Sequence, residues 1–408
     1  MKVLRVIASM DPASGGPCQG IRNAIPELKK LGMDTEVVCL DAPDSEFISK
    51  DDFKIYALGP GKTSWCFAHR LMTWLGVYLR NYDVVIVHGL WQFHGFAVRK
   101  VLKFLRQNGE KTLPAFYVMP HGMLDPYFQK ASGRKLKAIR NWFYWKLIES
   151  KIINNADGIF FTCEEELILA RTTFTPYHPK RELNVGYGIE EPPPFDEHMK
   201  HAFFSKCPEV GGKSFILFLS RIHNKKGVDL LIEAYENMVR QFAGKQQVPL
   251  LVVAGPGMDT PYGQALKTAV DSSAHIREKV FFPGMLGGEA KWGAFYTSEA
   301  FILPSHQENF GISVAEALAC SKPVLISDQV NIWREIEQSG AGFIAHDDVK
   351  GVESLLDSWM NSGEDQKKAM AFRARQCYIK HFAIAPAARK VFDIINTSAS
   401  TNPTITHA

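Results

Sequence analysis

The chain has 408 residues, of which 46% are hydrophobic and 22% are charged. This balance is typical of a soluble globular protein, and it excludes a mainly disordered, collagen-like or coiled-coil chain. At about 100–200 residues per domain, the length predicts two domains or three. The formal net charge of +4 is too small for a dedicated nucleic-acid-binding protein, in which the basic excess is large and concentrated.

The cysteines and the N-terminus indicate the compartment. Seven cysteines are scattered without any C-x-x-C pair, which argues against a disulfide framework or a zinc ribbon and favours a reducing compartment. The apolar run at residues 2–8 is broken by Arg5 and is too short for a secretion signal. No stretch approaches the roughly 20 apolar residues of a membrane span. We therefore expect a cytoplasmic protein.

Strand-like and helix-like segments alternate along the chain. In the first half, apolar runs predict strands at 2–8, 35–40, 83–88, 115–119 and 157–162, and helical patterns lie at about 18–31, 65–80 and 135–154. In the second half, strands are predicted at 214–219, 249–254, 279–282, 300–303 and 323–326, and helices at 227–241, 261–272, 311–321, 350–361 and about 364–397. This alternation implies βαβ units and parallel sheets.

A proline-rich segment separates the two halves. The sequence Glu190-Glu191-Pro192-Pro193-Pro194 cannot lie in the interior of a sheet. We therefore predict one domain over 1–190, a second over 191–375, and a C-terminal segment over 376–408 that ends in a frayed tail. The expected fold class is α/β, with two Rossmann-like domains whose parallel sheets face a central cleft. Ligands of such sheets bind beyond the carboxyl ends of the strands, so the informative residues should follow strands.

Glycine and histidine motifs follow strands of the first half. Gly15-Gly16 precedes a predicted helix, where glycine permits close approach of a ligand and the helix N-terminus favours an anion, although an ordinary tight turn would look the same. His121-Gly122 ends the strand at 115–119, where the histidine could donate to a substrate or bond within its own loop. His88-Gly89 ends another strand in the same way, and Trp91 and His94 follow it.

Two cations flank a predicted helix N-terminus in the second half. Arg221 follows the strand at 214–219, and Lys226 directly precedes the helix. Two cations beside the partial positive charge of a helix end repel one another unless an anion lies among them, and a diphosphate would suit that position. The alternative is a solvated basic loop.

The block PSHQENFGISVAEALA follows another predicted strand and opens a helix. Glu316 lies in it among small and apolar residues, so we expect it to be buried, and a ribose diol could supply the donors that its carboxylate needs. Glu308 precedes the helix, where the amides of Gly311, Ile312 and Ser313 should be free. The alternative is a glutamate that caps its own helix and another that pairs with an arginine.

Several other chemistries lack their motifs. The GKS and GKT triplets do not have the upstream glycine of a P-loop, and H-E-x-x-H, G-x-S-x-G and D-x-D are absent from the sequence. The G-x-G-x-x-G fingerprint is absent too, which disfavours an NAD-dependent oxidoreductase. We predict no metal site and no nucleic-acid partner.

A basic aromatic stretch covers residues 130–151. It holds seven Lys and Arg residues against one acid, Glu149, with four consecutive aromatic residues at 142–145. Such a composition suits an anionic membrane surface or an anionic glycan. The alternative is a solvated helix whose aromatic side chains pack inward.

Together these motifs resemble those of retaining GT-B glycosyltransferases of family 4, the bacterial polysaccharide and lipopolysaccharide type. The motifs that carry the resemblance are Gly15-Gly16, His121-Gly122, Ser220-Arg221 with Lys226-Gly227, Ala254-Gly255-Pro256-Gly257, and the block from Glu308 to Glu316 followed by Lys322-Pro323-Val324. Asn309 departs from the pattern, since many members have glycine there. The linker Gly186-Tyr187-Gly188-Ile189-Glu190 fits the family's usual linker only loosely.

The resemblance implies a transferase that moves a hexosyl unit from a nucleotide-diphosphate sugar, UDP rather than GDP, to a saccharide or lipid-linked saccharide in polysaccharide biosynthesis. It implies a helix at 376–408 that crosses back to the N-terminal domain, no cofactor or metal, and peripheral contact of 130–151 with the cytoplasmic face of the inner membrane. The implied catalytic residues are His121, Arg221, Lys226 and Glu308. The implied donor-binding residues are Gly15, Gly16, Gly255, Gly311, Ile312, Ser313 and Glu316, and the implied acceptor-binding residues are His88, Trp91 and His94.

Two alternatives stay open at this point. A nucleotide-sugar epimerase has the same architecture, but it would need carboxylates on both sides of the sugar. A non-catalytic sugar-nucleotide-binding protein would bind the donor and release no nucleotide.

Overall fold

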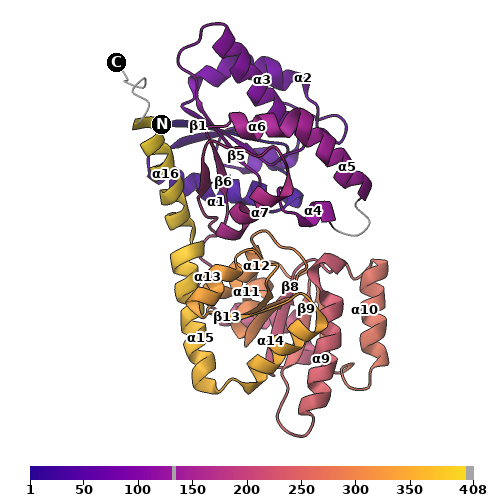
Figure 1. Ribbon diagram of the computed structural model, residues 1–408. Coiled ribbons are helices and arrows are strands. Elements are labelled where there is room, and N and C mark those ends of the chain that lie inside the picture. Colours follow the sequence, from indigo (N-terminus) through magenta and orange to yellow (C-terminus); the bar gives the residue numbers. More distant parts are fainter. Residues whose placement is uncertain (131–134, 401–408) are drawn as a thin grey trace. The chain divides into compact units, whose positions relative to one another are not determined.

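The computed structural model describes residues 1–130 and 135–400 (Figure 1). These residues form two compact α/β units, each built around a parallel sheet. The first unit comprises Met1–Gly188 together with the C-terminal helix α16 (Ile384–Ser400), and the second comprises Ile189–Ala383. The predicted fold class, α/β with two Rossmann-like domains, is confirmed in these two units.

The sheet of the first unit has the strand order β3-β2-β1-β4-β5-β6-β7. Its strands are β1 (Lys2–Ile7), β2 (Asp34–Cys39), β3 (Ile55–Ala57), β4 (Val84–His88), β5 (Ala115–Met119), β6 (Gly158–Phe161) and β7 (Glu182–Asn184). The order reverses between β1 and β4, and ligands of doubly wound sheets bind at the carboxyl ends of such strands. In the register of the sheet, His88 lies between Ile7 of β1 and Met119 of β5.

Helices cover both faces of this sheet, which is why its central strands are apolar on both sides. The helices are α1 (Gly16–Lys30), α2 (His69–Tyr78), α3 (Phe93–Gln107), α4 (Tyr127–Lys130), α5 (Lys135–Tyr144), α6 (Ser150–Asn155) and α7 (Glu164–Thr173). One core cluster joins β1, β4 and β5 to α2, α3 and α6, and another joins β1 and β2 to α1. Helix α16 packs against α1, as can be followed in Figure 1.

The sheet of the second unit has the order β10-β9-β8-β11-β12-β13, with its reversal between β8 and β11. Its strands are β8 (Phe215–Leu219), β9 (Leu250–Ala254), β10 (Val280–Gly284), β11 (Ala300–Leu303), β12 (Val324–Ser327) and β13 (Gly342–Ala345). Its helices are α8 (Glu197–Lys206), α9 (Val228–Phe242), α10 (Pro261–Ser272), α11 (Gly288–Thr297), α12 (Ile312–Ala319), α13 (Trp333–Ser339), α14 (Val349–Asn361) and α15 (Glu364–Cys377). Helix α9 shows how the sequence selects this packing, because its buried residues recur every three or four positions along one face.

Each strand that the apolar runs predict is present, with ends shifted by no more than two residues. The runs do not reveal β3, β7 and β13, which lie at edges of the two sheets. All three are short and only half buried, so they lack the continuous apolar pattern of a central strand.

Two predicted helices are interrupted. A π-helical segment at Trp145–Glu149 (η4) separates α5 from α6 in the helix predicted at 135–154. Another at Tyr378–Phe382 (η7) ends α15, and the extended residue Ala383 precedes α16. The chain therefore changes unit after Ala383, whereas the sequence placed the start of the C-terminal segment at 376. The predicted frayed tail falls largely on 401–408, outside the described residues.

In the described part of the chain, no helix is both long and apolar enough to cross a membrane.

Candidate functional site

The loops after β8 and β11 lie against each other. Lys226 ends a 3-10 turn, and Gly227, with a φ of 66°, directly precedes α9. A Cβ atom at Gly227 would lie 2.1 Å from the carbonyl oxygen of Pro304, so only glycine allows this approach. The hydroxyl of Ser305 and the amide of His306 both donate to the carbonyl oxygen of Lys225, at 3.0 and 2.9 Å. Residues about 80 positions apart in sequence are thereby held side by side.

Lys226 and Glu308 form an ion pair across these two loops. The Lys226 side chain is buried, while that of Glu308 is 23% exposed. Burial and the neighbouring cations Lys225 and Arg221 lower the pKa of the Lys226 amine to about 7. An ammonium has about three donors and a carboxylate about four lone-pair sites, so a single contact leaves both groups able to bind a ligand.

Arg221, the other predicted cation, is exposed at the end of β8. Lys226 lies directly before Gly227 and the start of α9, whereas the approach of Arg221 to this helix end stays a prediction.

Glu308 also stands at the start of α12. The helix begins after Gly311, whose φ is 74°, and among the residues of the described ranges no side chain caps it. The first amides of a helix, here those of Ile312 and Ser313, have no intrahelical acceptor. The backbone of Glu308 is fixed by two hydrogen bonds of 2.9 Å, from its amide to Gln329 and to its carbonyl from Asn331. Uncapped amides, a carboxylate and a buried ammonium thus gather at one point.

Glu316 lies on the next turn of α12 and is half-buried. Its Oε1 accepts a hydrogen bond of 2.7 Å from Nζ of Lys291 on α11. The sequence predicted a buried glutamate whose carboxylate a ribose diol could satisfy. Lys291 satisfies one of its two oxygens, and the contact with a ribose stays a prediction. Lys291 has no sequence signal of its own, since α11 was not predicted as a helix.

Gly255, predicted to bind the donor, has a packing role. A Cβ atom there would lie 1.8 Å from the carbonyl oxygen of Ser220, and the φ of Gly255 is 143°. The close contact of the loops after β8 and β9 is enough to require glycine at this position.

Gly15 and Gly16 mark the start of α1 in the first unit. Gly15 has a φ of 93°, and nothing lies within 4 Å of the position that a Cβ atom would take. The carbonyl oxygen of Gly16 accepts a hydrogen bond of 2.6 Å from the hydroxyl of Tyr187. Tyr187, which lies in the predicted linker, therefore fixes the start of this helix.

The predicted histidines meet at the carboxyl end of β4. His88 Nδ1 lies 2.9 Å from His121 Nε2, and His94 Nε2 lies 2.8 Å from the carbonyl oxygen of His88. His88 and His94 are buried, and the first turn of α3 directs His94 into the core, so the contact of these two residues with an acceptor stays a prediction. His121 is only partly buried and has a positive φ of 54°, which is uncommon outside glycine.

Trp91, the third residue predicted to bind the acceptor substrate, has its backbone amide hydrogen-bonded to a glutamate. Its backbone φ is 69°, and its amide donates a hydrogen bond of 2.8 Å to Oε1 of Glu149. Glu149 is buried in the π-helical segment η4, and burial raises the pKa of its carboxyl to about 8. In the sequence, Glu149 stands out only as the single acid of a basic stretch, and nothing there predicts its contact with Trp91.

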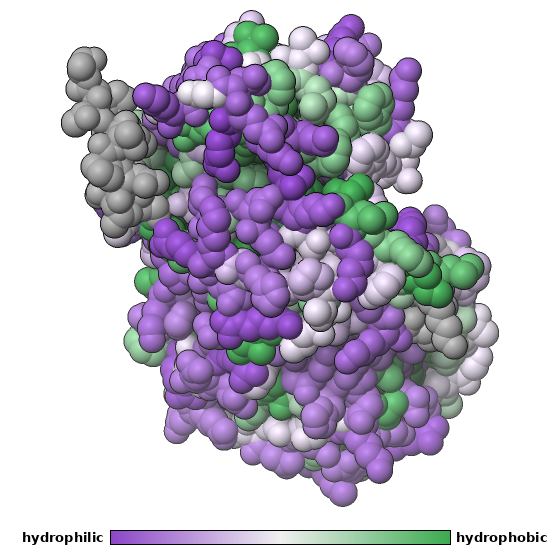
Figure 2. Space-filling view, turned by 45° about the horizontal axis from the view of Figure 1, so that its top comes forward, coloured by the Kyte–Doolittle hydropathy of each residue, from purple (hydrophilic) through white to green (hydrophobic). Residues whose placement is uncertain are grey.

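The basic aromatic stretch divides between core and surface. Residues 131–134 of the predicted 130–151 stretch lie outside the described residues. Trp145 is fully buried, whereas Trp142 and Phe143 are 48% and 56% exposed. Leu136, at 84% exposed, and Leu147 add apolar surface, and the space-filling view in Figure 2 shows such hydrophobic areas within a mostly hydrophilic face.

Among the residues that the structure describes, no group of three or more His, Cys, Asp or Glu side chains has the arrangement of a metal site.

Two protein-family models match the chain, one in each half. The model described as Glycosyl transferase 4-like domain matches residues 15–181, and the model described as Glycosyl transferases group 1 matches residues 200–376.

Relatives and solved structures agree with the family models. An uncharacterized glycosyltransferase of Methanocaldococcus jannaschii is 28% identical over 190 residues, which cover 44% of this chain and 46% of that relative. This match therefore spans less than half of that relative's length. A glycosyltransferase of Rickettsia africae superposes with a TM-score of 0.74 at 15% identity over 97% of this chain and 98% of that one. HepE of Anabaena in complex with UDP superposes with a TM-score of 0.71 at 15% identity over 97% of this chain and 100% of that one.

Proposed function

Because the chain is a GT-B glycosyltransferase of family 4, we propose that it transfers a hexosyl unit from a nucleotide-diphosphate sugar to a saccharide or lipid-linked saccharide, with retention of anomeric configuration. The observation that carries this proposal is the Lys226–Glu308 pair at the uncapped start of α12. HepE, a structural neighbour, binds UDP, and on that likeness we propose UDP rather than GDP as the carrier here. Polysaccharide biosynthesis is the process that the motifs favour.

The proposed chemistry follows from where charge develops. When the bond between the sugar C1 and the diphosphate oxygen breaks, negative charge builds on the diphosphate. Arg221, Lys226 and the amides at the start of α12 are donors suited to that charge, and each such preorganised donor contributes roughly 10²–10³ in rate. In this proposal they take the place of a divalent metal.

The acceptor completes the reaction. Its hydroxyl oxygen bonds to C1 from the face that the diphosphate leaves, and its proton passes to a diphosphate oxygen. Glu308 accepts hydrogen bonds from sugar hydroxyls, and the free oxygen of Glu316 accepts from the ribose. Gly15 and Gly16 form the open turn that the diphosphate approaches, and His121 donates to the transferred sugar.

Family membership supports a transferase over the two alternatives. An epimerase and a non-catalytic binding protein share the architecture, but the matching family models describe transferases. Donor turnover that needs no acceptor and yields an altered nucleotide sugar would return the epimerase to consideration.

A thermal-shift panel tests the proposed donor and the proposed absence of a metal. UDP, UDP-hexoses and GDP-hexoses are compared, each with magnesium and with EDTA. A bound ligand stabilises the folded state by mass action, so we expect UDP-hexoses to raise the unfolding temperature equally in both conditions. A shift only with magnesium contradicts metal independence, and no shift with any nucleotide sugar contradicts the donor.

The stereochemical part of the proposal has its own readout. Slow transfer to water in place of the acceptor releases free hexose, whose anomers NMR distinguishes before they equilibrate. Retention predicts that the anomer of the donor appears first, and early release of the opposite anomer contradicts it.

We also propose that the exposed side of α5 and η4 contacts an anionic membrane surface at the cytoplasmic face of the inner membrane. Leu136, Phe143 and Leu147 are exposed there beside the exposed basic residues Arg140 and Lys146. Basic residues near a surface of anionic lipid contribute about 1 kcal/mol each, and exposed apolar side chains add buried area in the headgroup region.

Vesicle sedimentation tests this contact. We expect the full chain to bind phosphatidylglycerol vesicles more than phosphatidylcholine vesicles, and to bind them less as salt is added, because charges are screened. The double substitution Phe143→Gln and Leu147→Gln should lower the bound fraction, whereas Phe372→Gln, at a residue that is 66% exposed in the second unit, should not. Equal binding of both variants and both lipids contradicts the proposal.

A further inference from the structure

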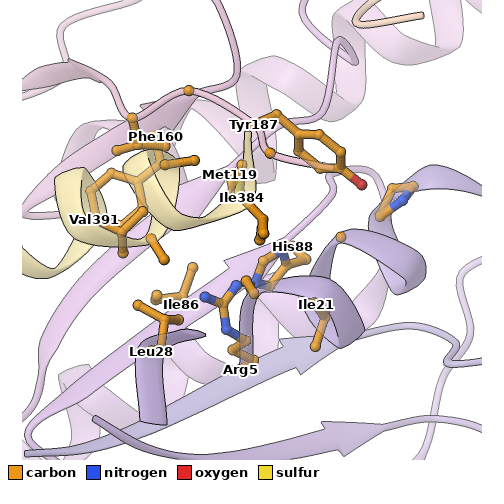
Figure 3. Close-up of a pocket in the computed structure, with 18 of the residues that line it drawn as sticks. Arg5, Ile21, Leu28, Ile86, His88, Met119, Phe160, Tyr187, Ile384 and Val391 are labelled. Carbon is orange, nitrogen blue, oxygen red and sulfur yellow. The ribbon is translucent and has the colours of Figure 1, made fainter. Parts of the chain in front are cut away.

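A buried arginine lies in the middle of β1. Arg5 is only 5% exposed, and it lines a cavity of about 40 Å³ together with residues of α1 and α16. Figure 3 shows its guanidinium beside His88, with Ile384 and Tyr187 around the same cavity. In the described part of the chain no carboxylate pairs with Arg5, and its Nε has no partner. A buried cation without a counter-charge is costly, so a residue of this kind needs a reason.

The side-chain contact of Arg5 is with His88. Its NH1 lies 3.1 Å from Nε2 of His88, and Nδ1 of His88 lies 2.9 Å from Nε2 of His121. Nε2 of His94 lies 2.8 Å from the carbonyl oxygen of His88 and fixes the backbone of that residue. Arg5, His88 and His121 thus form one continuous chain of hydrogen bonds from the interior to a partly exposed ring.

The direction of this chain follows from the donor. A guanidinium only donates, so Nε2 of His88 accepts and carries no proton. A neutral imidazole has its single proton on the other nitrogen, so Nδ1 of His88 donates to Nε2 of His121. The proton of His121 is then on Nδ1. Burial lowers the pKa of both histidines, to about 3 for His121, with the charge of Arg5 adding to the effect, so both rings are neutral at pH 7.

The last donor of this hydrogen-bond series, the Nδ1–H of His121, can bind a ligand. In the described residues, Nδ1 of His121 has no protein acceptor, and the ring is partly exposed at the end of β5. The neighbouring amide of Gly122 is fixed by the buried carboxylate of Glu166, so the loop that holds His121 is anchored.

From this geometry we propose that Arg5 is a positioning residue that sets, through His88, the tautomer in which His121 presents its Nδ1–H to a substrate oxygen. The identity of that oxygen, an oxygen of the transferred sugar, rests on the proposed function. Without Arg5 the two imidazoles could reverse their hydrogen bonds, and His121 would then turn a lone pair toward the substrate.

The tautomer of His121 is measured by ¹⁵N NMR of the full chain with labelled histidine. In the natural protein we expect His121 to be protonated on Nδ1. In Arg5→Met we expect a mixture of tautomers and a kcat lowered about three- to tenfold with little change in donor affinity, because the bias of one charge-assisted hydrogen bond is lost. Arg5→Lys restores a donor without an acceptor and should restore both readouts.

Two results would overturn the proposal: protonation of His121 on Nε2 in the natural protein, or an unchanged tautomer in folded Arg5→Met. The first needs no variant, so a variant that fails to fold does not prevent the test. The spectrum also needs no substrate. The expected tautomer in a chain that turns over no nucleotide sugar would therefore overturn the proposed function and leave the role of Arg5 in place.

Discussion

Replacement of Lys226 by alanine is expected to lower kcat by about 10²–10³-fold, the usual effect of removing one donor that faces developing charge. Lys226 is buried at the point where Glu308 and the start of α12 meet, so no other cation of the loop can take its place without rearrangement. Donor affinity should also fall, because in the proposed mechanism the ammonium contacts the diphosphate before as well as during the reaction.

The fold should tolerate this change. Glu308 loses its partner but is 23% exposed and lies at the positive end of a helix, so water and the helix amides can compensate. We expect the free energy of unfolding to fall by about 1–2 kcal/mol. Lys245→Ala, which removes an exposed lysine from the same unit, is the matched control. Turnover within a few-fold of the natural enzyme in folded Lys226→Ala would contradict the assignment.

Glu308→Gln is expected to cost about 10²-fold in kcat/KM at pH 7.5, since it removes the counter-charge of Lys226 and the charge-assisted hydrogen bonds that we propose to the sugar. The pKa of Lys226 is already lowered to about 7, and without the carboxylate it should fall further. In the proposed mechanism, activity requires protonated Lys226. The variant should therefore lose activity at a lower pH than the natural enzyme and recover part of it as the pH falls toward 6.

The pH profile of kcat/KM over pH 5.5–9 checks this prediction. Glu278→Gln, at an exposed glutamate of the same unit, should leave the profile unchanged. The double variant of Lys226 and Glu308 should lose much less kcat/KM than the product of the two single fold-losses, because the effects of two residues that contact each other are not additive. An unchanged basic limb in Glu308→Gln would contradict the coupling of the two groups.

The sequence predicts both the central strands and the part of the candidate site that follows β8 and β11, because both depend on parallel strands that are buried on two faces. Strands buried on both faces need continuous apolar runs, and residues that follow neighbouring strands β8 and β11 meet at one sheet edge. Arg221, Lys226 and Glu308 could therefore be selected from the sequence. The edge strand β13 could not, because it is half-buried and its residues show no such run.

Pairings made by the tertiary fold lie beyond the sequence patterns. Arg5 and His88 are 83 positions apart, and nothing near Arg5 in sequence marks its partner. Lys291 reaches Glu316 from a helix that the periodicity did not reveal. His94 follows His88 closely in sequence, which suggested a shared role at the surface, but the turn into α3 buries it.

The affinity of the natural enzyme and of Lys226→Ala for UDP and for uridine, measured by calorimetry, tests the central claim most directly. If Lys226 and the start of α12 bind the diphosphate, the natural enzyme should prefer UDP to uridine by at least about 10²-fold, as one or two charge-assisted hydrogen bonds would give. Lys226→Ala should lose most of that preference while its affinity for uridine stays the same. An equal preference for UDP in both proteins would contradict the account.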